Sequence, residues 1–69
     1  MNDVNFVTIR SYKDPIIADI MVATLHNAGI DTMVTNESQT MLPLENIEIK
    51  VKETDVDQAL EIIEEQEAL

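Results

Sequence analysis

The sequence of 69 residues contains no cysteine and a single histidine. These absences exclude disulfide bonds, thiolate metal sites and zinc sites built from several histidines. A chain of this length buries only about 60% of the surface that its unfolded state exposes, so a lone domain is marginally stable. Small domains without disulfides or metals are commonly stabilised by a partner subunit. The composition therefore predicts one domain, residues 1–69, without metal or cofactor, in a homo-oligomer (a dimer or trimer).

Basic residues are also scarce, with four against 14 acidic residues and a net charge of −10. Nucleic acids and anionic membrane surfaces bind clustered positive charge, so we expect neither as a partner. No apolar run approaches the length of about 18 residues that crosses a bilayer. The start of the chain (MNDVNFVTIR) lacks the basic segment, apolar run and small-residue cleavage site of a secretory signal, which predicts a cytoplasmic protein.

Hydrophobic periodicity predicts three strands and two helices in the order strand, helix, strand, strand, helix. Alternating β-branched and apolar residues indicate strands over residues 6–12, 30–36 and 47–52. The first helix is expected to begin after Asp14 as N-cap, with Pro15 at its first position. It ends at Gly29, the only glycine, in a left-handed conformation. A capping-box pattern, Thr54-x-x-Asp57, predicts the start of the second helix.

The order of these elements predicts a layered fold. A right-handed crossover places the first helix on one face of the sheet, and the second helix returns to the same face. The third strand then lies between the first and second strands. This is an α+β, ferredoxin-like split sandwich, with a three-stranded antiparallel sheet, two helices on one face and the fourth strand missing. The first strand then has an unpaired edge, which invites pairing with another chain.

The first helix carries more apolar residues than one stripe requires. Only Asp19, Thr24, His26 and Asn27 interrupt the apolar residues of the segment 16–28. A helix that is apolar nearly all round is normally buried on more than one side. Since a 69-residue monomer has little material to cover it, the pattern again predicts contact with another subunit.

A second unusual feature is the loop that joins the second and third strands, ESQTMLPLEN. Its centre is apolar although its flanks are polar. The loop either packs within the protomer or oligomer, or docks on a partner protein, since loops carry binding residues disproportionately and Met adapts to contact surfaces. The candidate partner-binding residues are Asn36, Glu37, Met41, Leu42, Pro43 and Leu44.

Three of the four basic residues fall together on the predicted open face of the sheet. Strict alternation places Arg10, Lys50 and Lys52 there, flanked by aromatic residues. Such a face could hold an anionic ligand, meet an acidic helix of another subunit, or be solvated and carry cross-strand charge pairs. Acidic residues on the same face count against RNA. The candidate ligand-binding residues are Arg10, Tyr12, Lys50 and Lys52.

Catalysis needs a nucleophile next to a base, or paired carboxylates in a cleft. Ser11, His26, Ser38 and Thr40 are available, but no spacing in the sequence joins them. We therefore expect no enzyme. The predicted function is a regulatory or protein-interaction module that oligomerises through its first helix or a sheet edge and recognises partners through residues 36–45. The alternative is a sensor of a small anionic ligand on the open sheet face.

The segments FVTIRSYKDPIIADIMVATLHNAGIDTMVTNE and IEIKVKETDVDQALEII resemble the putative prokaryotic signal-transducing protein family, which consists of small bacterial domains. The matching pattern includes Asp-Pro before the first helix, the small Ala18, and Leu25-x-x-x-Gly-Ile. It continues with Asn36-Glu37 and the Ala-Leu-x-Ile-Ile of the second helix. The family is similar in fold to the trimeric nitrogen-regulatory signal transducers, which have a ferredoxin-like fold and contact partners through the hairpin loop. The resemblance thus implies a regulatory role.

Overall fold

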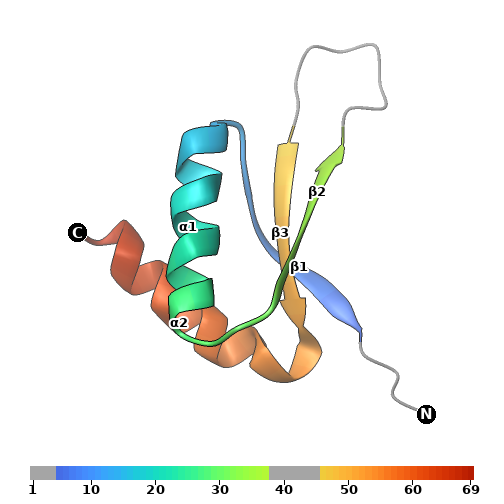
Figure 1. Ribbon diagram of the computed structural model, residues 1–69, viewed down its shortest axis with the longest axis vertical. Coiled ribbons are helices and arrows are strands. Elements are labelled where there is room, and N and C mark those ends of the chain that lie inside the picture. Colours follow the sequence, from blue (N-terminus) through green and yellow to red (C-terminus); the bar gives the residue numbers. More distant parts are fainter. Residues whose placement is uncertain (1–4, 38–45) are drawn as a thin grey trace.

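The computed structural model describes residues 5–37 and 46–69 of the chain. The element order is strand, helix, strand, strand, helix, as predicted, with a short 3-10 turn before the second helix (Figure 1). The elements are β1 (Phe6–Tyr12), α1 (Pro15–Asn27), β2 (Thr32–Glu37), β3 (Asn46–Lys52), the 3-10 turn η1 (Glu53–Asp55) and α2 (Val56–Glu67).

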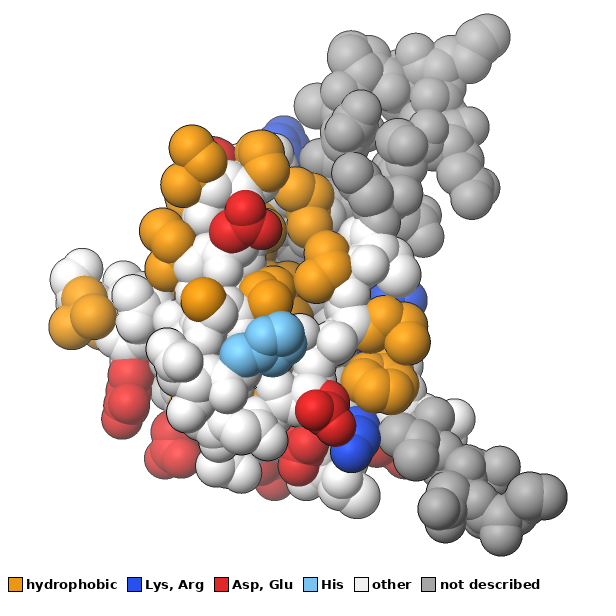
Figure 2. Space-filling view, in the orientation of Figure 1, with side chains coloured by type: hydrophobic (Ala, Val, Ile, Leu, Met, Phe, Trp, Pro, Cys, Tyr) orange, Lys and Arg blue, Asp and Glu red, His pale blue; other side chains and the backbone are white. Residues whose placement is uncertain are grey.

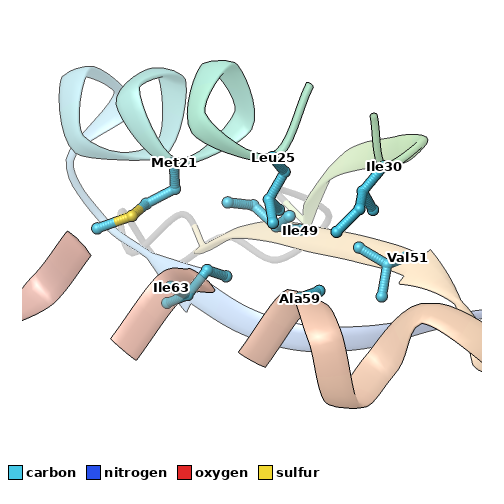
Figure 3. Packing of buried hydrophobic residues seen from close by; sticks show 7 residues of the cluster. All are labelled: Met21, Leu25, Ile30, Ile49, Val51, Ala59 and Ile63. Atoms are coloured by element: carbon cyan, nitrogen blue, oxygen red, sulfur yellow. The ribbon is translucent and has the colours of Figure 1, made fainter. Parts of the chain in front are cut away.

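The three strands form one antiparallel sheet in the order β1-β3-β2. Figure 3 shows side chains of both helices pointing toward the same side of β3, where Ile49 and Val51 are fully buried. The predicted α+β sandwich, with the third strand in the middle and both helices on one face, is confirmed. Among the described strands, β1 and β2 are the two edges of the sheet.

The core lies between the two helices and β3 (Figure 3). The core cluster has seven members, namely Met21 and Leu25 of α1, Ile30 before β2, Ile49 and Val51 of β3, and Ala59 and Ile63 of α2. Burial of a Val, Leu, Ile or Met side chain, which all members except Ala59 have, stabilises the fold by about 1.5–3 kcal/mol each. With so few members, the core fits the marginal stability that the length of the chain predicts.

Both ends of α1 follow the sequence prediction. The carboxylate of Asp14 accepts a hydrogen bond of 2.9 Å from the Ile16 N–H. At the other end Gly29 adopts φ +82°, which glycine tolerates without steric cost. The Gly29 N–H donates to the His26 carbonyl (2.9 Å) and the Ile30 N–H to the Leu25 carbonyl (3.0 Å). These two bonds form a Schellman motif, which satisfies the last carbonyls of the helix.

The Schellman motif also explains why β2 starts later than predicted. Ile30 was expected to open the strand because it is β-branched, but β2 begins at Thr32. Ile30 is only 3% exposed and packs in the core next to the end of α1. Ile30 thus makes the hydrophobic contact that accompanies a Schellman motif, and it does not pair in the sheet.

A bulge in β1 overturns the predicted alternation of that strand. Thr8 pairs with Lys50, but the next pair joins Arg10 to Ile49, so the register shifts by one residue. An extra residue moves every later side chain to the opposite face. Arg10 and Tyr12, expected on the open face, therefore lie on the face that the helices cover, with Tyr12 packed against the core.

The start of α2 also differs from the prediction. Thr54 lies within the 3-10 turn η1, and the N-cap of α2 is Asp55, which makes no side-chain capping hydrogen bond. The predicted capping box between Thr54 and Asp57 is therefore wrong. The Glu53 N–H donates a hydrogen bond of 2.9 Å to the Asn5 carbonyl, which ties this turn to the start of β1.

Candidate functional site

The outer side of α1 exposes large apolar side chains. Solvent reaches 68% of Ile16, 41% of Ile17 and 46% of Ile20, while Ala18 and Met21 of the same helix are buried. Figure 2 shows hydrophobic side chains gathered over α1 and over the strands beside it. The surplus apolar residues that the sequence indicates on α1 are thus exposed in the protomer, and their contact with another subunit stays a prediction.

The edge strand β2 adds two more exposed apolar side chains, one on each face of the sheet. Val34 pairs with the buried Ile49 and so lies on the helix face, where it is 48% exposed. Met33 pairs with Lys50 on the opposite face and is 45% exposed. We call Ile16, Ile17, Ile20 and Val34 the apolar surface. The three isoleucines share one side of α1, since they are one, three and four positions apart, and exposed apolar patches mark protein interaction sites.

Charge is distributed unevenly around the apolar surface. Within α1 the one acidic residue is Asp19, and within β2 it is Glu37. Half of the 14 acidic residues follow Lys52, in η1 and α2, namely Glu53, Asp55, Asp57, Glu61, Glu64, Glu65 and Glu67. A strongly charged protein thus carries its apolar surface on the less charged of its two helices and on a strand with a single charged residue.

The four candidate ligand-binding residues divide between the two faces of the sheet. The Arg10 Nε lies 3.6 Å from a carboxylate oxygen of Glu67, and the Tyr12 hydroxyl donates a hydrogen bond of 2.8 Å to the same oxygen. Burial, followed by this hydrogen bond, raises the pKa of Tyr12 from 10.0 to about 12. Both side chains therefore contact the last turn of α2 rather than the open face.

The other two candidates, Lys50 and Lys52, remain on the open face and lie close to carboxylates. The Lys50 Nζ is 3.7 Å from Glu48, which also accepts a hydrogen bond of 3.2 Å from the Thr8 hydroxyl. The Lys52 Nζ is 3.0 Å from Asp31, and this hydrogen bond raises the pKa of Lys52. The Lys50–Glu48 pair lies within β3, and the Lys52–Asp31 pair joins β3 to the residue before β2, so only the second resembles the predicted cross-strand charge pairs. Binding of an anionic ligand stays a prediction.

The structure places only part of the candidate partner-binding segment. Asn36 and Glu37 end β2, where their backbones pair with Ile47 and Asn46 of β3. The remaining candidates, Met41, Leu42, Pro43 and Leu44, lie outside the described residues. The pairing fixes the two ends of this hairpin loop at one end of the sheet.

One further contact between polar side chains lies at the end of α1. His26 Nε2 lies 2.9 Å from the Thr32 hydroxyl, a contact between the end of α1 and the start of β2. Within residues 5–37 and 46–69, no three His, Asp or Glu side chains are placed to hold a metal ion. In the same ranges neither helix combines the length and hydropathy needed to cross a membrane.

Sequence reasoning missed Val34 and Glu67. Val34 was a foreseeable member of the apolar surface, because the predicted topology already made β2 an edge strand. Glu67 gave no local signal, since it meets Tyr12 across 55 positions of the chain and through an unexpected bulge.

The comparison with family models gives one match. The family described as putative prokaryotic signal transducing protein matches residues 6–67, from the first residue of β1 to the last residue of α2. No curated protein and no solved structure matches the chain significantly.

Proposed function

The chain belongs to the family of putative prokaryotic signal transducing proteins, and from this membership we propose that it is a non-enzymatic regulatory module that acts in the cytoplasm through protein contacts, both with a second copy of itself and with a partner protein. The observation that carries the proposal is the exposed apolar outer side of α1, with Ile16 as its most exposed member. A small protein gains no stability from isoleucines left in water, whereas an interface uses them.

We assign two separate tasks to two surfaces. The loop of residues 36–45 is the recognition surface for a partner protein, because its sequence joins the paired ends of β2 and β3 and contains Met41, Leu42 and Leu44. Methionine is enriched at protein interfaces, and leucine adds apolar contact area when it is buried there. The apolar surface serves self-association, which leaves the loop free for the partner.

The experiment is site-specific photocrosslinking in the host cell. A benzophenone amino acid replaces Leu42 in the loop, Ile16 on α1 or, as the control, Gln58, which is exposed on α2. We expect a discrete adduct with a different protein from position 42, and none from position 58. A loop variant with Ser at Met41, Leu42 and Leu44 is expected to lose that partner while keeping its circular dichroism spectrum.

Two results would contradict recognition by the loop. One is the same adduct pattern from positions 42 and 58, which would indicate random collisions. The other is a partner that the triple-serine variant still binds with unchanged affinity. Neither result depends on whether the chain also associates with itself.

A further inference from the structure

The two edges of the sheet differ in how readily they could pair with another strand. The β1 edge is interrupted by the bulge between Thr8 and Arg10, and the Arg10 guanidinium donates a hydrogen bond of 3.1 Å to the Ile9 carbonyl. Bulges and charged side chains are the means by which proteins protect an edge against pairing. The β1 edge, which the sequence analysis singled out, is therefore a poor template for a further strand.

The β2 edge has none of this protection. It pairs with β3 in regular register from Thr32 to Glu37, with no bulge and no proline. Its residues up to Asn36 are uncharged. Val34 and Met33 expose apolar side chains on the two faces of this strand. An edge in regular register, uncharged except at its last residue and with apolar side chains on both faces, readily takes up a further strand.

We propose that a second copy of this chain pairs its β2 with β2 of the first, antiparallel and across a twofold axis, so that the two sheets join into one. The proposal names the surface and the partner of the self-association in the proposed function, and to that extent rests on it. An antiparallel strand edge is complementary to itself, and a twofold axis uses the same residues from both copies. Val34 then meets the second copy on the helix side of the joined sheet.

Electrostatics favour this edge for contact between two copies. Each copy carries a net charge of −10, so two copies repel each other over most approaches. The acidic helix α2 packs on α1, β1 and β3. An approach through β2 and α1 involves the two elements that contribute only Asp19 and Glu37 to that charge. The repulsion on this approach is therefore weaker than on an approach through the acidic helix α2.

The size of the contact indicates which class of interface it belongs to. Six residues of strand are about 20 Å long, and the sheet with its helix layer is about 20 Å deep, so each copy contributes a footprint of about 400 Å². The total of about 800 Å² lies below the range of about 1,200–2,000 Å² that is typical of stable complexes. The backbone hydrogen bonds between the strands add specificity rather than area. We therefore expect a reversible dimer.

Sedimentation velocity of the purified full chain tests the proposal, with total concentrations from about 1 μM to about 1 mM. The variant Val34→Lys introduces a charge at the proposed contact. The matched control Leu69→Lys makes the same change of charge at a side chain that is 96% exposed at the end of α2. We expect a monomer–dimer equilibrium for the wild type and for Leu69→Lys, and a dissociation constant at least about 10-fold higher for Val34→Lys.

Added salt provides a second readout. It screens the repulsion between the two acidic copies, so the wild-type dissociation constant is expected to fall as the salt concentration rises. Because Val34 is half-buried, its replacement could also loosen the fold. Met33→Lys places the charge on the other face of the same strand, away from the core, and is expected to weaken the dimer as well.

Three results would overturn the proposal. The first is a wild-type chain that stays monomeric at the highest concentration. The second is a dimer whose dissociation constant is no higher for Val34→Lys and Met33→Lys than for Leu69→Lys. The third is a trimer, since a twofold strand pair closes with two copies. All three are measured on the purified chain, so they are distinct from failure of the loop to bind a partner protein.

Discussion

The hydroxyl of Tyr12 donates a hydrogen bond of 2.8 Å to the carboxylate of Glu67, 55 residues further along the chain. The bond joins the end of β1 to the last turn of α2. That turn contains no basic residue, and the carboxylate of Glu67 is unfavourable near the negative end of the helix dipole. Tyr12, with Arg10 at 3.6 Å, gives this carboxylate partners that the helix itself does not provide.

The first prediction concerns the strength of that link. We expect Tyr12→Phe to lower the free energy of unfolding by about 0.5–1.5 kcal/mol, toward the lower value because the bond is exposed. The ion pair of Arg10 with Glu67 is partly exposed and longer, so Arg10→Gln should cost about 0–1 kcal/mol. Urea unfolding of the two variants measures both values. A larger loss for Arg10→Gln than for Tyr12→Phe would contradict this ranking.

The second prediction concerns alkaline pH. The pKa of Tyr12 rises from 10.0 to about 12 in the folded protein, mainly through burial and then through its bond to Glu67. A pKa that is higher in the folded state gives a stabilising contribution that is complete below about pH 10 and is lost as the pH rises toward 12. The folded protein should therefore lose stability over this interval, and Tyr12→Phe should lose less.

The chain offers a direct measurement of that pKa. Tyr12 is the only tyrosine and the chain has no tryptophan, so tyrosinate absorbance in the near ultraviolet reports this residue alone. In Glu67→Gln the side chain keeps an acceptor but loses its charge, and the pKa of Tyr12 should fall part of the way back toward 10.0. A wild-type titration centred at 10.0 in the folded protein would refute the contact.

The third prediction isolates backbone strain at Gly29. A Cβ atom built at this position meets no heavy atom within 4 Å, so substitution causes no clash. The loss of stability in Gly29→Ala then comes from the φ of +82° at this position. A non-glycine residue adopts this left-handed conformation at a free-energy cost of about 1–2 kcal/mol. Gly29→Asn should cost less, because Asn tolerates the left-handed region better. Thermal unfolding compares the two variants, and equal melting temperatures for Gly29→Ala and wild type would contradict the prediction.

The sequence predicted those parts of the fold that depend on local signals. Asp14 and Gly29 mark the two ends of α1 because capping is chemistry between near neighbours. The alternation in β3 follows from one buried and one open face, and the regular pairing with β2 preserves it. Element order and sheet topology followed from these segments and the handedness of crossovers.

The parts that could not be predicted depend on tertiary contacts. No glycine or proline in β1 signals its bulge, which brings both Ile9 and Tyr12 against the core. The predicted basic face combined Arg10 with Lys50 and Lys52, so a shift of one residue was enough to divide it. The capping box at Thr54 failed for a similar reason, because a 3-10 turn bound to Asn5 precedes the helix.

The fourth prediction contrasts the two sides of α1. Leu25 is fully buried in the core, so Leu25→Ala should remove about 2–5 kcal/mol through lost burial and the cavity that remains. A domain of this length has about 3–10 kcal/mol of stability in total, so this variant should be partly or fully unfolded at 37 °C. Ile16 is exposed, and Ile16→Ala should change the stability of the monomer by no more than about 0.5 kcal/mol.

Dilute protein is required for this comparison, because self-association would add stability that depends on concentration. Under these conditions urea unfolding should separate the two variants by at least about 1.5 kcal/mol. At high concentration we expect Ile16→Ala to lose a further part of its stability relative to wild type, because Ile16 belongs to the apolar surface. A large loss for Ile16→Ala in dilute solution would mean that the outer side of α1 stabilises the monomer itself, which would remove the observation on which the proposed function depends.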